Sequence, residues 1–364
     1  MELNVNQQAF FALVRAGLWE KKARLSQFND IDYSAIMRLA EGQSVVGLVT
    51  AGLEHVEDVK VPKEVLLQFI GSTLQIEQQN KAMNNYVAKL IELLRKEDIY
   101  AILVKGQGIA QCYERPLWRS SGDVDLLLSD TNYDKAKKVL TPLAVSVESE
   151  YKAFKHLGMT MPEEFEVEVH GTLHSRLSKR VDRVIDEAQR DVFFSANVRS
   201  WTNGNTAVFL PSPDNDIIFV FTHILHHFFI EGVGLRQICD WCRLLWTYRE
   251  SLNHGLLESR IREAGLISEW KAIAALAVDW LGMPVEAMPF YSTDKKWSRK
   301  AERIIAFVLV CGNFGHNRQA SVGKVSSAWN KMKDFARHLR VFPMDSVKFF
   351  CHFMMDGIKL AMTR

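Results

Sequence analysis

Long apolar runs are absent from this sequence of 364 residues. Runs such as 304–311 (IIAFVLVC) and 217–221 (IIFVF) are far short of the roughly 20 residues that a membrane-spanning helix needs. The N-terminal segment MELNVNQQAF also lacks the basic stretch followed by an apolar stretch that marks a secretory signal. We therefore expect a chain without a membrane span that stays in the cytoplasm.

A large net charge and a set of paired cysteines are also missing. The 45 basic and 43 acidic side chains nearly cancel to a formal charge of +2, so no extended surface for nucleic acid is expected. Five scattered cysteines fit reduced, buried thiols better than a disulfide framework. Cys239 and Cys242 form a lone CxxC inside the helix-like run LRQICDWCRLLW, which favours packing over zinc or redox chemistry.

The common glycine-rich phosphate motifs do not occur either. No GxxxxGK[ST] is found, and Gly106-Gln107-Gly108 lacks the third glycine of a dinucleotide-binding loop. Internal repeats and low-complexity tracts are absent too, while 48% hydrophobic and 24% charged residues are ordinary for a folded protein. The whole chain should fold, and it is longer than a typical single domain.

Three regions follow from the hydrophobic patterning. Residues 1–97 repeat apolar side chains at a spacing of three to four, which predicts a helical N-terminal region. Residues 98–210 alternate short apolar runs with turns and a few helices, which predicts an α+β core. Residues 211–364 return to helical spacing, with Pro213 placed to open the first helix of a helical C-terminal region.

Two β-hairpins are expected inside the central region. The segments KHLGMTM and FEVEVHGTL are separated by the turn-like residues 162–164. The segment VRSWTNGNTAVFL carries Asn203-Gly204, which we expect at the tip because this pair favours the left-handed backbone of a tight turn.

The strongest chemical signal is the run SSGDVDLLL. Side chains alternate faces along a strand, so Asp123 and Asp125 should project to one side and form a natural site for a hard metal ion. The alternative is a strand that merely begins with two solvated carboxylates. The run FEVEVH adds Glu166, Glu168 and His170 on one strand face, although acidic residues are depleted from strands and so need a reason there.

These motifs occur in an order that resembles a known family. The order is Lys105-Gly106 after an apolar strand, then Arg119-x-x-Gly122-Asp123-x-Asp125-Leu126-Leu127, then Glu168-x-His170, and then His223 and His227 ahead of Arg236 and Asp240. Over roughly residues 65–250 the chain resembles the uncharacterised nucleotidyltransferase-like family of bacterial proteins, within the polymerase-beta-like superfamily.

The resemblance implies a small mixed sheet with three acidic residues around one or two magnesium ions, or manganese in their place. Asp123 and Asp125 match the metal-binding pair, and Glu168 matches the third carboxylate. The implied reaction transfers a nucleoside monophosphate from a nucleoside triphosphate to an acceptor hydroxyl on a small molecule, a glycan precursor or a protein. The alternatives are a catalytically inactive nucleotide-binding or partner-binding module on the same fold, and metal-dependent phosphoester hydrolysis.

The phosphate-binding loop departs from the superfamily pattern. Most members have Gly-Ser where this chain has Lys105-Gly106, so Lys105 would supply a point charge and Gly106 a close backbone approach to phosphate. Gly122 belongs to the same expected nucleotide-binding set. Arg119 could clamp phosphate or brace a carboxylate, and a surface ion pair is equally compatible with its position.

The acceptor side is expected near Glu166 and His170. His170 could orient Glu168 or touch the acceptor, and a purely structural histidine is the alternative. His223 and His227 are four residues apart on an expected helix that also carries His226. Without the glutamate of an HExxH motif, these three histidines favour a polar packing seam over a metal site.

Overall fold

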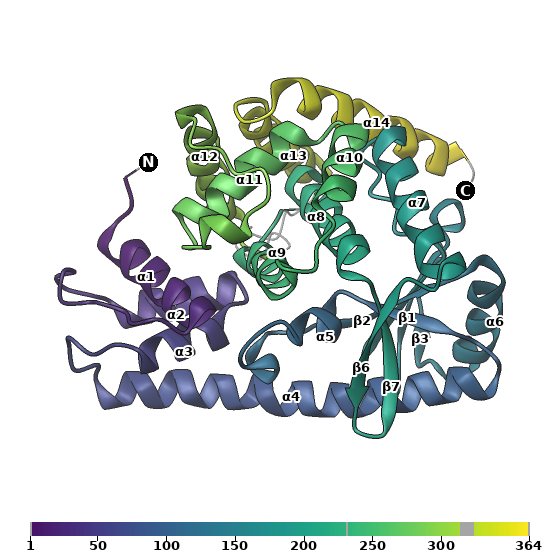
Figure 1. Cartoon of the computed structure of the whole chain (residues 1–364), viewed down its shortest axis with the longest axis horizontal. Coiled ribbons are helices and arrows are strands. Elements are labelled where there is room, and N and C mark those ends of the chain that lie inside the picture. Colours follow the sequence, from purple (N-terminus) through teal and green to yellow (C-terminus); the bar gives the residue numbers. More distant parts are fainter. Residues whose placement is uncertain (1, 231, 314–323, 363–364) are drawn as a thin grey trace. The chain divides into compact units, whose positions relative to one another are not determined.

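Seven strands form one mixed sheet in an otherwise helical protein. The computed structural model describes residues 2–230, 232–313 and 324–362 (Figure 1). No helix in these ranges is long and apolar enough to cross a membrane. The chain divides into a sheet unit, Ile70–His174 with Ile185–Phe219, and a helical unit, Met1–Phe69 with Ser175–Val184 and Val220–Arg364.

The sheet combines parallel and antiparallel neighbours in the order β3-β4-β5-β2-β1-β7-β6. β2 pairs antiparallel with β1 and parallel with β5, while β4 and β5 form one antiparallel hairpin and β6 and β7 another. The strands are β1 (Ala101–Val104), β2 (Asp123–Leu128), β3 (Ser146–Val147), β4 (His156–Thr160), β5 (Glu166–His170), β6 (Val198–Asn203) and β7 (Thr206–Pro211). The predicted α+β fold with a mixed sheet is confirmed.

The alternation of side chains gives this sheet one apolar face. Val124, Leu126, Val167 and Val169 are fully buried on it and belong to the same cluster as apolar residues of the helices α4 (Lys63–Lys96) and α6 (Asp130–Leu140). From α4 the cluster takes Met83, Tyr86, Val87, Leu90, Ile91 and Leu94. Because successive residues point to opposite faces, Asp123, Asp125 and Glu168 fall on the other face.

The second predicted hairpin is present, but its tip lies one residue later than predicted. Asn203 pairs with Thr206, so Gly204 and Asn205 form the loop, with Gly204 at φ 60°. The Asn203 amide donates a hydrogen bond of 2.6 Å to the Asn84 carbonyl of α4, which keeps Asn203 in the ladder. Figure 1 shows this hairpin crossing α4.

Most of the remaining helices lie in the helical unit, whereas α5 (Gly106–Ala110), residues 185–194 of α7 (Lys179–Phe194) and residues 213–219 of α8 (Pro213–Ile230) belong to the sheet unit. α8 begins at Pro213, as predicted. The other helices are α1 (Val5–Trp19), α2 (Tyr33–Gly42), α3 (Val46–Glu54), α9 (Leu235–Tyr248), α10 (His254–Ala264), α11 (Ile267–Asp279), α12 (Lys295–Cys311), α13 (Lys324–Leu339) and α14 (Pro343–Met362).

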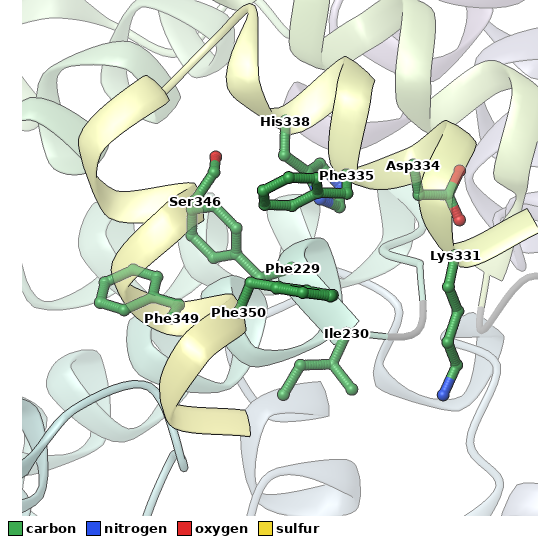
Figure 2. A pocket seen from close by; sticks show the side chains of 9 residues that line it. All are labelled: Phe229, Ile230, Lys331, Asp334, Phe335, His338, Ser346, Phe349 and Phe350. Carbon is green, nitrogen blue, oxygen red and sulfur yellow. The ribbon is translucent and has the colours of Figure 1, made fainter. Parts of the chain in front are cut away.

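A small pocket lies where the end of α8 meets α13 and α14. Figure 2 shows the rings of Phe229, Phe335, Phe349 and Phe350 gathered around it. Its volume is about 30 Å³, which holds one or two water molecules but is far below the roughly 300–1,000 Å³ of ligand sites. This volume is that of a packing defect between helices.

Candidate active site

Three carboxylates meet on the polar face of the sheet. The parallel pairing of β2 with β5 sets Asp125 opposite Glu168 and Asp123 opposite Glu166. Carboxylate oxygens of Asp123, Asp125 and Glu168 lie within 4.8 Å of one another. Like charges this close repel strongly unless a cation or a proton lies between them, so the arrangement needs positive charge.

Part of that charge comes from Lys105 at the end of β1. Its ammonium Nζ lies 2.8 Å from Oδ1 of Asp125, which is only 2% exposed. Burial alone would raise the pKa of Asp125, but the attraction of Lys105 and the hydrogen bond from His170 outweigh it and lower that pKa. Burial likewise opposes the charged form of Lys105, and the attraction of Asp125, Glu168 and Asp123 raises its pKa.

The backbone at Lys105 has an unusual conformation. Lys105 has φ 58° and ψ −142°, in a region that glycine occupies far more readily than lysine. Gly106 follows at φ 35° and opens α5, so the chain turns sharply between the strand and the helix. A Cβ on Gly106 would stand 3.4 Å from the carbonyl oxygen of Asp123, which is ordinary contact, so φ is what favours glycine here. This turn directs the Lys105 side chain to Asp125.

His170 joins Asp125 to Glu168. Its Nε2 lies 2.8 Å from Oδ1 of Asp125 and 3.3 Å from Oε2 of Glu168. Ionised carboxylates only accept hydrogen bonds, so Nε2 carries the proton and donates it. Burial would lower the pKa of His170, but its hydrogen bonds to Asp125 and Glu168 raise that pKa instead.

His156 completes this side of the cluster, and the sequence alone did not reveal it. Its Nε2 lies 3.1 Å from the same Oε2 of Glu168, and its ring centroid lies 4.8 Å from that of His170. Burial would raise the pKa of Glu168, whereas the hydrogen bonds from His156 and His170 lower it. The signal was present, because the predicted turn at 162–164 sets the hairpin register that pairs His156 with His170.

Comparison with known families identifies the chain. The model of a family described as uncharacterised nucleotidyltransferase matches residues 29–282. The chain belongs to this family. No curated protein and no solved structure matches it. For a nucleotidyltransferase, family membership implies a nucleoside triphosphate as substrate.

The three carboxylates fit a hard divalent cation. Oxygen ligands from two aspartates and a glutamate are what magnesium prefers. Oδ1 of Asp125 already accepts from Lys105 and His170, so a cation would share this carboxylate with protein donors. The donor set is therefore compatible with the metal that the sequence predicts.

The other residues predicted for the site lie around this cluster. The Arg119 guanidinium is mostly buried and donates to the Ser120 carbonyl and the Ser121 hydroxyl, so it braces the loop that leads into β2. A Cβ added to Gly122 would meet nothing within 4 Å, which leaves open space beside Asp123. Glu166 is exposed and accepts from the Thr160 hydroxyl at 2.8 Å, outside the three-carboxylate group.

The remaining histidine and cysteine motifs form no metal-binding group within the described ranges. Nε2 of His223 and His227 lie 3.0 Å apart, and within the described ranges no third ligand joins them in a metal-binding group. Nδ1 of His226 lies 2.6 Å from the carbonyl oxygen of Ser175. Cys239 and Cys242 are free thiols in the core, and burial raises the pKa of both, which keeps them protonated.

Proposed function

We propose that the protein is a metal-dependent nucleotidyltransferase that moves a nucleoside monophosphate from a nucleoside triphosphate to an acceptor hydroxyl. The observation that carries the proposal is the convergence of Asp123, Asp125 and Glu168 at the adjoining strands β2 and β5. Membership of a nucleotidyltransferase family supports it. The acceptor is a hydroxyl of a small molecule, a glycan precursor or a protein.

The three carboxylates would hold magnesium, or manganese in its place. Such an ion supplies charge neutralisation for the triphosphate and acidifies the acceptor hydroxyl. Asp125 is fixed by Lys105 and His170, so its carboxylate cannot swing away. His170 and His156 fix Glu168 in the same way, which keeps the polar face arranged before substrate arrives.

Lys105 and the loop before β2 form the proposed nucleotide side. A lysine ammonium has three donors, so Lys105 can keep its bond to Asp125 and still donate to a phosphate oxygen. The turn at Gly106 and the open space at Gly122 allow a phosphate to approach the backbone. Arg119 holds the shape of this loop.

Magnesium-dependent nucleotide binding tests the proposal. Asp123→Asn removes one carboxylate charge from a partly exposed position, so it should abolish magnesium-dependent triphosphate binding and leave the melting temperature nearly unchanged. Titration calorimetry on chelator-treated protein, with and without magnesium, measures this. Glu166→Gln, on the same face but outside the carboxylate group, is the matched control. Equal triphosphate affinity in wild type and Asp123→Asn would contradict the metal role.

A binding module without catalysis is the second candidate function. It is favoured by the ion pair of Lys105 with Asp125, which already neutralises a carboxylate that the metal needs. Incubation with α-labelled triphosphates and a cell extract separates the two functions. Transfer of label to an acceptor with release of pyrophosphate supports the enzyme. Tight magnesium-dependent binding without transfer or pyrophosphate supports the module.

A further inference from the structure

A second group of metal-ligand atoms adjoins the three carboxylates. Nε2 of His156, a carboxylate oxygen of Glu168 and Nε2 of His170 lie within 4.8 Å of one another. Both imidazole nitrogens approach the same oxygen, Oε2 of Glu168, at 3.1 and 3.3 Å. Glu168 therefore belongs to both groups and faces a different kind of ligand on each side.

Two of the three separations among these atoms are those of a transition-metal centre. Tetrahedral bonds of about 2.0–2.1 Å place neighbouring ligand atoms about 3.3–3.4 Å apart, close to the two separations observed. Two imidazoles and one carboxylate are ligands that zinc, cobalt and iron accept, whereas magnesium prefers oxygen alone. The antiparallel register that pairs His156 with His170 supports this geometry.

The backbone around the cluster also limits how the ligands can move. His156 and His170 lie on adjacent strands, and their rings are inclined by only 34° to one another. Oδ1 of Asp125 accepts from Nε2 of His170 at 2.8 Å, so a metal at that nitrogen would require Nε2 to give up this proton and the ring to carry its proton on Nδ1, as in a neutral imidazole ligand. His156 keeps a side-chain exposure of 25%, which gives an ion a path from solvent.

We propose that His156, Glu168 and His170 form a second cation site, selective for a transition metal, that shares Glu168 with the three-carboxylate group. This inference deepens the proposed function, because the shared glutamate would join two ions of different chemistry. The ion at this second site would have two nitrogen ligands, from His156 and His170. It would also neutralise part of the negative charge of the Glu168 carboxylate. The second site can be tested without an assay of catalysis, because metal binding alone would reveal it.

Cobalt(II) is the probe, because its visible absorption reports ligand number and type. Chelator-treated full-length protein should bind cobalt with a visible d–d band, and His156→Ala should weaken binding by about tenfold or more and reduce the band. His156→Cys keeps a ligand and should restore binding with a new thiolate-to-metal band in the near ultraviolet. This rescue separates loss of a ligand from loss of the fold.

Two controls locate the cobalt. His223→Ala alters the other histidine pair and should leave cobalt affinity within about threefold of wild type. Asp123→Asn should do the same while it abolishes magnesium-dependent triphosphate binding. Cobalt affinity unchanged in His156→Ala, a band lost in His223→Ala, or no band in wild type would each overturn the second site. Normal cobalt behaviour without magnesium-dependent nucleotide binding would instead overturn only the proposed function.

Discussion

Lys105 is the residue at which this chain departs from the superfamily pattern that its sequence resembles, and its surroundings explain how a lysine can stand there. The side chain is 19% exposed and has one carboxylate partner at 2.8 Å, with Glu168 and Asp123 also attracting it. Its conformation at φ 58° is uncommon for a residue with a Cβ. The ammonium therefore lies beside the three carboxylates, where the proposed function would bring the phosphates of a nucleotide.

Removal of this charge should discriminate between nucleotides. Lys105→Ala should weaken triphosphate binding by about 1.5–3 kcal/mol, the usual value of a charge-assisted hydrogen bond, and weaken monophosphate binding much less. The reason is that only the triphosphate presents β- and γ-phosphates. Parallel titrations of both nucleotides below the melting temperature of the variant provide the measurement. Equal losses for the two nucleotides would assign Lys105 a structural role alone.

Lys105 should also stabilise the folded protein, because its ammonium pairs with the buried carboxylate of Asp125. Lys105→Met removes the ammonium partner of the Asp125 carboxylate, which is only 2% exposed. This loss should lower the free energy of unfolding by about 3–5 kcal/mol. Adding Asp125→Asn removes the buried charge, so the double variant should recover most of the loss. Urea unfolding of the four proteins in this cycle gives the coupling energy. Additive losses would mean that the ion pair contributes nothing beyond its separate side chains.

At the scale of elements, the helical unit contains an acid that burial keeps protonated. Glu269 of α11 is fully buried, and among the residues that the structure describes no other residue donates a hydrogen bond to either of its carboxylate oxygens. Burial raises its pKa well above the usual 4.5, and the Asp345 carboxylate of α14 raises it further. When Glu269 is protonated, its carboxyl group can donate a hydrogen bond to the Asp345 carboxylate, which links α11 to α14.

This raised pKa sets the direction of a pH effect. Stability contributed by the proton is fully present below the ordinary glutamate pKa and is lost as pH rises through the raised pKa of the folded state. Glu269→Gln should therefore match wild type near pH 4, below the ordinary glutamate pKa, and be more stable by at least about 1 kcal/mol at pH 8. Thermal unfolding across this range measures the difference. The exposed Glu286→Gln is the control, and parallel profiles for all three proteins would refute the assignment.

At the scale of the whole molecule, the sheet depends on a helix that precedes it in the chain. Residues 98–210 are the predicted core, but α4 supplies five fully or nearly fully buried side chains to its apolar face. These are Met83, Val87, Leu90, Ile91 and Leu94. At about 1.5–3 kcal/mol each, their burial contributes as much as the entire net stability of a typical domain.

Fragments should reveal this dependence. A fragment of residues 98–210 exposes the apolar sheet face and should lack cooperative unfolding, whereas a fragment of residues 70–219 retains the α4 contacts and should unfold cooperatively. Circular dichroism melts and amide proton dispersion in NMR spectra distinguish these states. Cooperative unfolding of 98–210 would show that α4 is dispensable for the core.

The sequence by itself determined the features that depend on residues adjacent in the chain, namely the strand faces and the turns. Alternation along 123–128 and 166–170 placed the carboxylates on one strand face, and turn residues fixed both hairpins to within one residue. Where a single distant contact competes with local preference, prediction failed. The hydrogen bond from Asn203 to Asn84 holds Asn203 in the ladder and moves the loop to Gly204 and Asn205.

Only the tertiary structure decided how the strands were joined. Local patterns cannot state that β2 pairs in parallel with β5, because about 40 residues separate them and strand pairing is a non-local interaction. That pairing set Asp125 opposite Glu168, and the β4–β5 register added His156 beside them. The sequence shows which residue types could serve as ligands. The packing of the sheet decided that they lie together and that Lys105 pairs with Asp125.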